Sequence, residues 1–207
     1  MRVKISEIGR IVTGKTPSTK YPTNYGGDIP FVSPTDMGSE RYVQSTQKTL
    51  SKEGLSTNGN TLLPDNSVLV SCIASVEKTG IIKTPSVTNQ QINSIEVDST
   101  RFCYLYVYYH LQTLTPLLIQ MASGGSVQPI INKTGFSKIE LDVPSLEIQR
   151  AIAHILGMLD DKIEMNLKIN ETLQGIAKAL FKSWFVDFDP VRAKVDGRST
   201  GLHDDIS

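Results

Sequence analysis

The segment GRIVTGKTPS, residues 9–18, holds the residues that could most readily do chemistry, because its first eight letters fit the phosphate-binding pattern G-x-x-x-x-G-K-[ST]. Such a loop binds phosphate through backbone N–H groups and the N-terminus of a following helix. Here the variable positions include Ile11, Val12 and Thr13, whose β-branched side chains favour a strand. After Thr16 the chain reads PSTKYPTNYGGDIP, and this proline and glycine content predicts a loop where a helix is required. The sequence therefore argues against nucleotide binding.

The remaining residues with catalytic or metal-binding chemistry are scattered. His110, His154 and His203 lie far apart in the sequence, without the spacing of zinc ligands. Asp187 and Asp189 lie just before a proline, which favours a helix end or a docking contact over acid–base catalysis. We therefore predict no metal site and no catalytic residue in this chain.

Composition indicates a soluble globular protein, since 39% of the 207 residues are hydrophobic and 20% are charged. We expect no membrane association, because no apolar run is long enough to cross a bilayer and no signal peptide is present. Cys72 and Cys103 are the only cysteines, which predicts reduced thiols and a cytoplasmic location. Lys and Arg balance Asp and Glu at 21 each, so any nucleic-acid binding must rely on a local patch or a basic partner.

Residues 1–144 predict a mixed α/β domain with a β-sheet at its centre. Residues 101–123 are long enough for a helix, interrupted at Pro116. Short apolar runs bounded by turn residues predict strands at 66–75, 79–83 and 136–143.

Residues 145–188 contain no proline and predict a single long helix, with Ser145 as its N-cap and Glu147 in its first turn. Apolar residues recur at alternating spacings of four and three, as in a coiled coil. The members of this seam are Ile152, Leu156, Leu159, Ile163, Asn166, Asn170, Leu173, Ala177, Leu180 and Trp184.

Such a helix would be about 66 Å long, roughly twice the ~30 Å diameter of a domain of this size. Its outer half must therefore meet a partner helix or expose an apolar stripe to water. Asn166 and Asn170 would fix the register of a coiled coil, although both could instead face solvent where the seam drifts. We expect pairing with a second copy, followed by a tail at 189–207.

The chain resembles the specificity (S) subunits of type I restriction-modification systems, over nearly its whole length. Five sequence blocks carry the resemblance in the same order, none of them decisive alone. They are TGKTPS with GGDIPFVSPTDM, then TNQQINSI, then SGGSVQPIINKTGFSKIELDVPSLEIQRAIAHIL, and finally ETLQGIAKALFKSWFVDFDPVRAK.

The resemblance implies a non-catalytic reader of DNA sequence. In that family each target-recognition domain reads one half of a split site, two long helices pair antiparallel as a spacer, and methyltransferase subunits dock around them. S-adenosylmethionine, ATP and magnesium would belong to the methyltransferase and restriction subunits. This chain departs from the family in having one recognition domain and one helix, so it looks like a half-subunit, natural or truncated. Two copies would then read a palindrome with an unread gap.

Three loops have the chemistry to contact DNA, because Lys and Arg hold phosphates whereas Asn, Gln, Ser and Thr suit phosphates or base edges. Paired glycines in the third loop would allow the backbone to approach a phosphate closely. The candidates are Lys15, Thr16, Ser18, Lys20, Asn24 and Tyr25 in the first loop; Thr35, Asp36, Ser39, Arg41 and Tyr42 in the second; and Ser123, Gly124, Gly125, Ser126, Gln128, Asn132 and Lys133 in the third.

Two further segments have alternative interpretations. Asn89, Gln90 and Gln91 could read adenine or close the sheet with side-chain hydrogen bonds, and we favour the structural role. The tyrosines of YLYVYYH, residues 104–110, could stack on bases, but aromatic residues at helical spacing more often pack in a core. For the whole chain, the alternative to DNA recognition is a coiled-coil protein-interaction module that binds no DNA.

Overall fold

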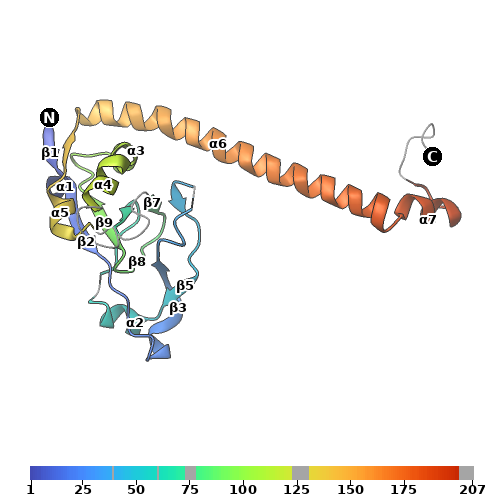
Figure 1. Cartoon of the computed structure of the whole chain (residues 1–207), viewed down its shortest axis with the longest axis horizontal. Coiled ribbons are helices and arrows are strands. Elements are labelled where there is room, and N and C mark those ends of the chain that lie inside the picture. The colour runs from blue at the N-terminus through green and yellow to red at the C-terminus, as the bar shows by residue number, and fades with distance from the viewer. Residues whose placement is uncertain (39, 60, 73–77, 123–130, 201–207) are drawn as a thin grey trace. The chain divides into compact units, whose positions relative to one another are not determined.

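A computed structural model describes the chain except for residues 39, 60, 73–77, 123–130 and 201–207. The chain forms two compact units, Met1–Met158 and Leu159–Ser207 (Figure 1). The predicted fold class is confirmed, because a mixed α/β unit with β-sheets is followed by a long C-terminal helix. The first unit extends past residue 144, where we predicted a domain boundary, and includes the first turns of that helix.

The central sheet of the first unit has five strands in the order β2-β9-β6-β7-β4. Neighbouring strands are antiparallel except for β7 and β4, which run parallel. Strands β6 and β7 lie within the predicted strands at 66–75 and 79–83. The bounds are β2 Gly9–Thr13, β4 Tyr42–Val43, β6 Val68–Ser71, β7 Thr79–Ile82 and β9 Ile92–Val97.

Two smaller sheets complete the β-structure of the described residues. Strand β3 pairs with β5 antiparallel and with β8 parallel, and β1 pairs with β10 antiparallel. Their bounds are β1 Arg2–Lys4, β3 Tyr25–Val32, β5 Lys48–Leu50, β8 Val87–Thr88 and β10 Glu140–Asp142.

Four short helical turns connect these strands: α1 Ile5–Ile8, the 3₁₀ turn η1 Pro22–Asn24, α2 Lys52–Thr57 and α5 Lys133–Ser137. The predicted strand at 136–143 is therefore wrong at its start, since Phe136 lies in α5. The side chain of Asn132 accepts a hydrogen bond from the backbone N–H of Gly135 and caps this helix.

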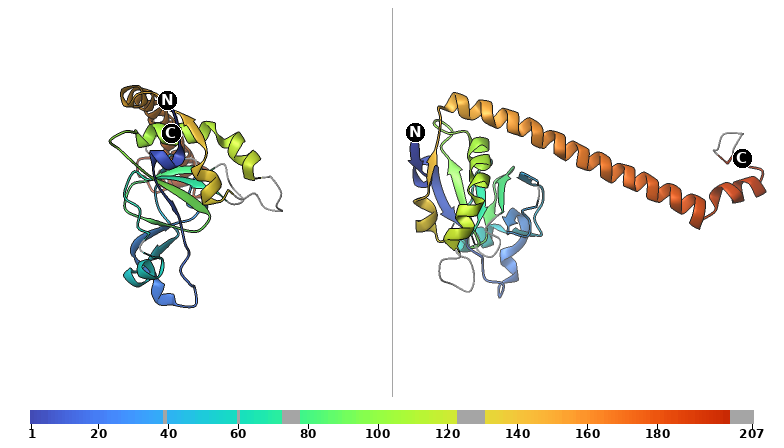
Figure 2. Two further views of the ribbon diagram at one scale, coloured as in Figure 1. Left: turned by 90° about the vertical axis from the view of Figure 1, so that its left-hand side faces the viewer. Right: turned by 45° about the horizontal axis from the view of Figure 1, so that its top comes forward.

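The predicted helix at 101–123 is present as two helices, α3 Tyr104–Thr113 and α4 Thr115–Ala122. The break falls at Leu114, and Pro116 lies in the first turn of α4, where its missing N–H costs no hydrogen bond within that helix. Helix α3 packs against β6 and β7 (Figure 2). Its residues Tyr106 and Tyr108 are buried in the main hydrophobic core, so these tyrosines pack in the interior as favoured above.

The long helix α6 spans Leu146–Phe181 and continues as a π-helical turn, η2 Lys182–Val186. Helical structure thus covers nearly all of the predicted segment 145–188. At Phe188 the backbone enters the left-handed region with φ of 54°, and a short helix α7, Asp189–Val195, follows with Pro190 in its first turn. The predicted tail therefore begins with a helix. Among the described helices, none is long and apolar enough to cross a membrane.

The start of α6 is fixed to the first unit by buried polar contacts. The side chain of Gln149 is 1% exposed, accepts a hydrogen bond from the Cys103 N–H at 3.0 Å and donates one to the Pro144 carbonyl at 3.0 Å. One turn later Ala153 is buried in the core, and the Arg41 guanidinium donates to the Gly157 carbonyl at 3.1 Å. One face of this helix segment is therefore already occupied by its own globular unit.

The glycine of the T-G-K motif serves close packing between backbone segments, which predicts the effect of enlarging it. A Cβ at Gly14 would lie 2.1 Å from the carbonyl oxygen of Asn89 and 2.2 Å from that of Thr88. We expect Gly14→Ala to lower the free energy of unfolding by about 1–3 kcal/mol or more, measured by urea denaturation. The matched control is Gly38→Ala, which would meet no atom within 4 Å. Equal stability of the two variants would contradict this explanation of the motif.

Candidate nucleic-acid interface

The T-G-K segment runs extended beside the sheet and does not wrap around a phosphate. After β2, the Gly14 N–H donates to the Ile92 carbonyl and the Lys15 N–H donates to the Thr88 carbonyl, both at 3.1 Å. The next helical turn is η1, eight residues after Gly14 and only three residues long. The segment thus lacks the helix N-terminus that a phosphate-binding loop needs, which supports the argument against nucleotide binding.

A polar hollow of about 210 Å³ brings together residues from segments that lie far apart in the sequence. It joins the first loop, the second loop, the start of β5 and the TNQQ segment, with one aromatic side chain among the polar ones. Its lining residues are Thr16, Phe31, Ser33, Thr35, Asp36, Gln47, Lys48 and Asn89. We name this surface the polar hollow.

A second hollow, of about 330 Å³, shares Gln47 and Lys48 with the polar hollow. Its other lining residues are Thr19, Tyr25, Gly26 and Thr49. Gln47 and Lys48 are both exposed and lie where the two hollows meet. Sequence reasoning missed these two residues, because a three-residue strand such as β5 gives almost no periodic signal.

Asp36 organises the second loop. One carboxylate oxygen accepts from the backbone N–H of Ser33 at 2.8 Å and from its hydroxyl at 2.6 Å. The other oxygen accepts from the backbone N–H of Gln47 at 2.9 Å. Asp36 therefore links the loop to the residue before β5, and it leaves Thr35 exposed at the polar hollow. Its position favours a positioning role over direct contact with DNA.

Two predicted contacts of the first loop instead hold the loop together. Asn24 is 1% exposed, and its side-chain amide donates to the Ser18 carbonyl at 3.0 Å. The Tyr25 hydroxyl donates to the Pro17 carbonyl at 2.7 Å, and burial raises the pKa of this phenol. The prediction that Asn24 grips the DNA backbone is not supported, because its polar atoms point into the fold. Lys15, Thr16, Ser18 and Lys20 are all exposed.

The TNQQ segment divides into structural and accessible residues. Asn89 is 8% exposed, and its side chain exchanges two hydrogen bonds of 3.0 Å with the side chain and backbone of Gln91. This arrangement agrees with the structural role that we favoured for these two residues. Gln90, in contrast, is exposed and accepts a hydrogen bond from the Thr16 hydroxyl, so it lies beside the polar hollow.

The remaining predicted contacts lie elsewhere or outside the described residues. Arg41 is half-buried against α6 and lies over the Tyr42 ring at 5.0 Å, which favours a structural role, and its contact with DNA stays a prediction. Lys133 is exposed at the start of α5 and lines neither hollow. The predicted residues outside the described part of the chain are Ser39, Ser123, Gly124, Gly125, Ser126 and Gln128.

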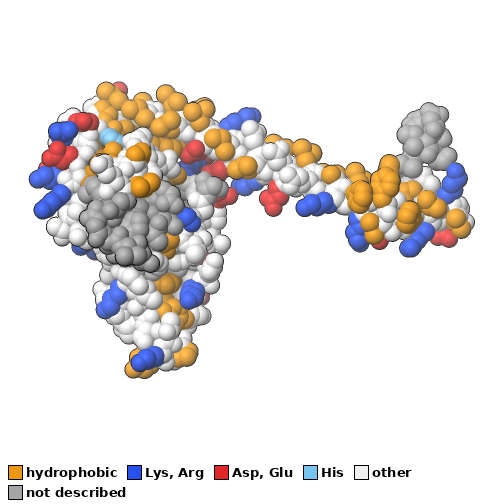
Figure 3. Space-filling model, in the orientation of Figure 1, with side chains coloured by type: hydrophobic (Ala, Val, Ile, Leu, Met, Phe, Trp, Pro, Cys, Tyr) orange, Lys and Arg blue, Asp and Glu red, His pale blue; other side chains and the backbone are white. Residues whose placement is uncertain are grey.

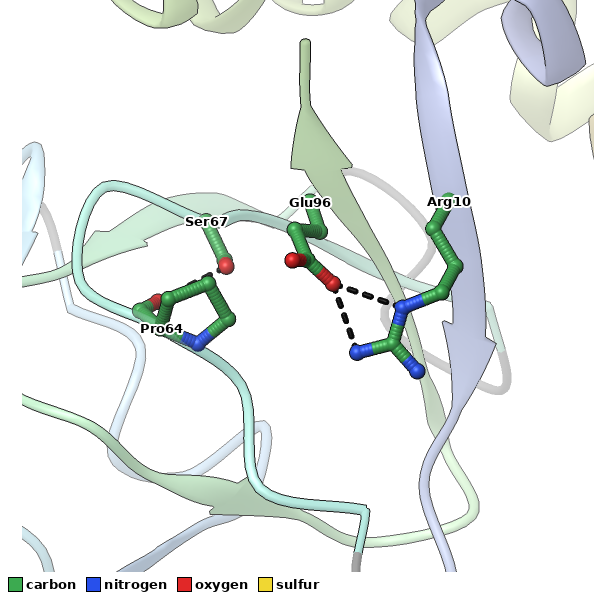
Figure 4. A network of polar contacts seen from close by, with 4 residues as sticks. All are labelled: Arg10, Pro64, Ser67 and Glu96. Carbon is green, nitrogen blue, oxygen red and sulfur yellow. Dashed lines mark hydrogen bonds and ion pairs between the residues drawn. The ribbon is translucent and has the colours of Figure 1, made fainter. Parts of the chain in front are cut away.

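The face of the first unit that Figure 3 shows has no single cluster of positive charge. On the face shown in Figure 3, lysine and arginine side chains are scattered over this unit. Arg10, which lies inside the motif, forms an ion pair with Glu96 across β2 and β9 at 2.6 Å (Figure 4). This pair neutralises Arg10, so the lysines near the two hollows, Lys15, Lys20 and Lys48, are better placed to meet phosphates.

The described residues hold no group of three or more His, Cys, Asp or Glu side chains that could bind a metal ion. Cys72 is free and buried, and burial raises the pKa of its thiol to about 11, so it is not a reactive thiolate. His110 lies beside the Tyr106 hydroxyl at 3.1 Å, and burial lowers the pKa of its imidazole.

The predicted seam of α6 is largely exposed in the single chain. Ile163 is 55% exposed and Leu173 is 56% exposed, whereas Leu156 is half-buried against the first unit. Asn166, Asn170 and Ala177 are also exposed. The apolar stripe is wider than the predicted seam, because it also includes Ile148, Ile155, Leu167, Ile169 and Ile176.

Comparison with known proteins gives a consistent picture. The chain is 34% identical over 192 residues to the type I restriction enzyme MjaIX specificity subunit of Methanocaldococcus jannaschii, covering 91% of this chain and 44% of that protein. It is 39% identical over 145 residues to the HindI specificity subunit of Haemophilus influenzae, covering 70% and 32%. The chain thus spans less than half the length of these relatives.

Solved structures share the fold. The HsdS subunit from Thermoanaerobacter tengcongensis matches with a TM-score of 0.61 and 20% identity, over 89% of this chain and 44% of that one. The S subunit from M. genitalium matches with a TM-score of 0.65 and 13% identity, over 89% and 45%. The model of the type I restriction modification DNA specificity domain matches residues 1–174, and the chain therefore belongs to that family.

Proposed function

We propose that this chain is the DNA-recognition subunit of a type I restriction-modification system. The observation that carries the proposal is the family match over residues 1–174, which includes every segment of the polar hollow. Relatives with this domain are named specificity subunits, so the chain would select the DNA site and leave catalysis to its partners. It would work in the cytoplasm with methyltransferase and, in some systems, restriction subunits, which would bind S-adenosylmethionine, ATP and magnesium.

The geometry of the first unit supports sequence reading at the polar hollow. Gln47 and Gln90 are exposed amides of the type that pairs with adenine, and Thr35 is an exposed hydroxyl. Lys15, Lys20 and Lys48 would hold phosphates on either side. Because the net charge of the chain is zero, these few lysines supply only part of the electrostatic attraction. A methyltransferase partner would supply the rest.

Two copies would pair antiparallel through the seam of α6, since this stripe of Leu and Ile is exposed in the single chain. A two-fold dimer of one reader presents two identical sites, which matches a split palindrome whose gap is set by the helix. The alternative function is a coiled-coil module without DNA binding. Such a module would pair in the same way, but the polar hollow would have no role in it.

Substitutions at the polar hollow test DNA recognition. With the methyltransferase bound, we expect Lys48→Ala to weaken binding to all sequences alike and to reduce the slope of log K against log salt by about 1. Gln47→Ala should instead relax the choice of one base, by about 1–3 kcal/mol, seen as new methylated sites in cells. Lys138→Ala is the control, because Lys138 is exposed and lines neither hollow. If DNA binding by the unaltered complex does not weaken as the salt concentration rises, the interaction module is favoured.

The oligomeric state tests the pairing. We expect a dimer at micromolar concentration by sedimentation equilibrium, and Ile163→Glu should shift it to a monomer, because it places a charge in the apolar seam. Lys168→Glu, five residues further on and on the opposite side of the helix, should leave the dimer intact.

A dimer in both variants would mean that the seam does not carry the pairing. An asymmetric methylated site in cells that express only this recognition chain would contradict the palindrome.

A further inference from the structure

An aromatic-walled pocket of about 240 Å³ lies on the first unit, between α3 and the start of α6. Its lining residues are Tyr106, Tyr109, His110, Thr113, Ile152 and Leu156. The rings of Tyr106 and His110, two of the lining side chains, pack edge to face with their centroids 5.5 Å apart. Ile152 forms one wall and is also a member of the seam of α6. The pocket thus borders the surface that the proposed homodimer would cover.

The seam fixes which residues of a second copy would reach this pocket. The spacings of four and three along the seam are the same when read from either end. In an antiparallel pair, the first seam residue of one copy therefore lies opposite the last seam residue of the other, the second lies opposite the second from last, and so on. Asn166 then faces the partner's Asn170, and Ile152 lies level along the helix axis with the partner's Trp184 in η2. A shift by one heptad in either direction would place each Asn against Leu, Ile or Ala, leaving buried amides unpaired. The asparagines therefore select this register.

Charges along the flanks are compatible with the same register. Asp160 lies beside the partner's Gln174, and Lys162 lies beside the partner's Ile176. Leu167 and Ile169 lie beside their own copies at the two-fold axis. No like charges face one another at these flanking positions, whereas Asp161 and Lys168 lie on the outer side of the helix.

The aromatic end of the helix has the chemistry to fill the pocket. Trp184 is the only tryptophan of the chain and is 41% exposed, in the π-helical turn η2. Phe181 and Phe185 lie beside it on the helix, with their rings 5.3 Å apart. An indole brings a large apolar surface and one N–H donor, and the Thr113 hydroxyl at the pocket can accept that hydrogen bond.

We infer that the pocket of each copy is occupied by Trp184 of the other copy. This inference rests on the proposed homodimer and adds to it a specific anchor at each end of the paired helices. Such a buried tryptophan at an interface is the type of residue that carries a large share of the binding energy. The pocket and the tryptophan would together link the spacer helix of one copy to the recognition unit of the other.

The single tryptophan provides a direct readout. On dilution from dimer to monomer, we expect Trp184 emission to move to longer wavelength and its quenching by acrylamide to increase. We expect Trp184→Ala to weaken the dimer about 30-fold. Thr113→Arg, which alters an exposed residue at the pocket, should weaken it in the same direction and increase quenching of Trp184 in the remaining dimer. Gln112→Arg is the control, since Gln112 is exposed and does not line the pocket.

A double-mutant cycle tests whether Trp184 and the pocket contact each other or contribute to the dimer independently. If Trp184 occupies the pocket, Thr113→Arg should have little further effect in the Trp184→Ala background, because the two changes remove the same contact. If acrylamide quenches Trp184 equally in the dimer and in the monomer, this inference is wrong, but the proposed homodimer is not affected. Protection of Trp184 in samples that sedimentation shows to be monomeric would mean that it is covered within its own chain and would also overturn the inference. A monomer at every concentration would overturn both proposals.

Discussion

The apolar stripe of α6 is the constraint on which the rest of the account depends. Each fully buried Leu or Ile side chain contributes roughly 1.5–3 kcal/mol, so a row of them left in water strongly favours pairing. Among the described residues, the buried positions of α6 are Gln149, Ala153 and Gly157, all in its first turns against the first unit. If a second helix covers the remaining stripe, the two recognition units are held at a separation set by protein structure rather than by a flexible linker.

Within the first unit, the polar residues divide into those that shape the surface and those that it presents. Three polar side chains form hydrogen bonds with neighbouring backbone and side chains and so fix three loops around the polar hollow. They are Asn24, Asp36 and Asn89. Gln47 and Lys48 are left exposed at its edge. Rigid support for a few accessible groups is what sequence reading requires, because a base is recognised only when donors and acceptors are held in place.

Local patterns predicted much of this fold. The heptad spacing correctly predicted the long helix, and apolar runs correctly predicted β6 and β7. Both signals depend on near neighbours in the sequence. The start of α5 at Lys133 and the burial of Asn24 depend on contacts with distant segments, which a local pattern does not contain. Lys48 was missed for the same reason, since its place beside Thr16 and Thr35 follows from the pairing of β3 with β5. The proposed function rests on the family resemblance, because periodicity alone indicates no function.

Cysteine cross-linking tests the central claim, antiparallel pairing centred between Asn166 and Asn170, most directly. One copy carries Ile163→Cys and the other Leu173→Cys, in a background where Cys72 and Cys103 are replaced by serine. The account predicts a disulfide in the mixture of the two copies and none in either alone, because residue 163 faces residue 173 of the partner. Cross-linking of the Ile163→Cys chain to itself would indicate parallel helices and would contradict the account.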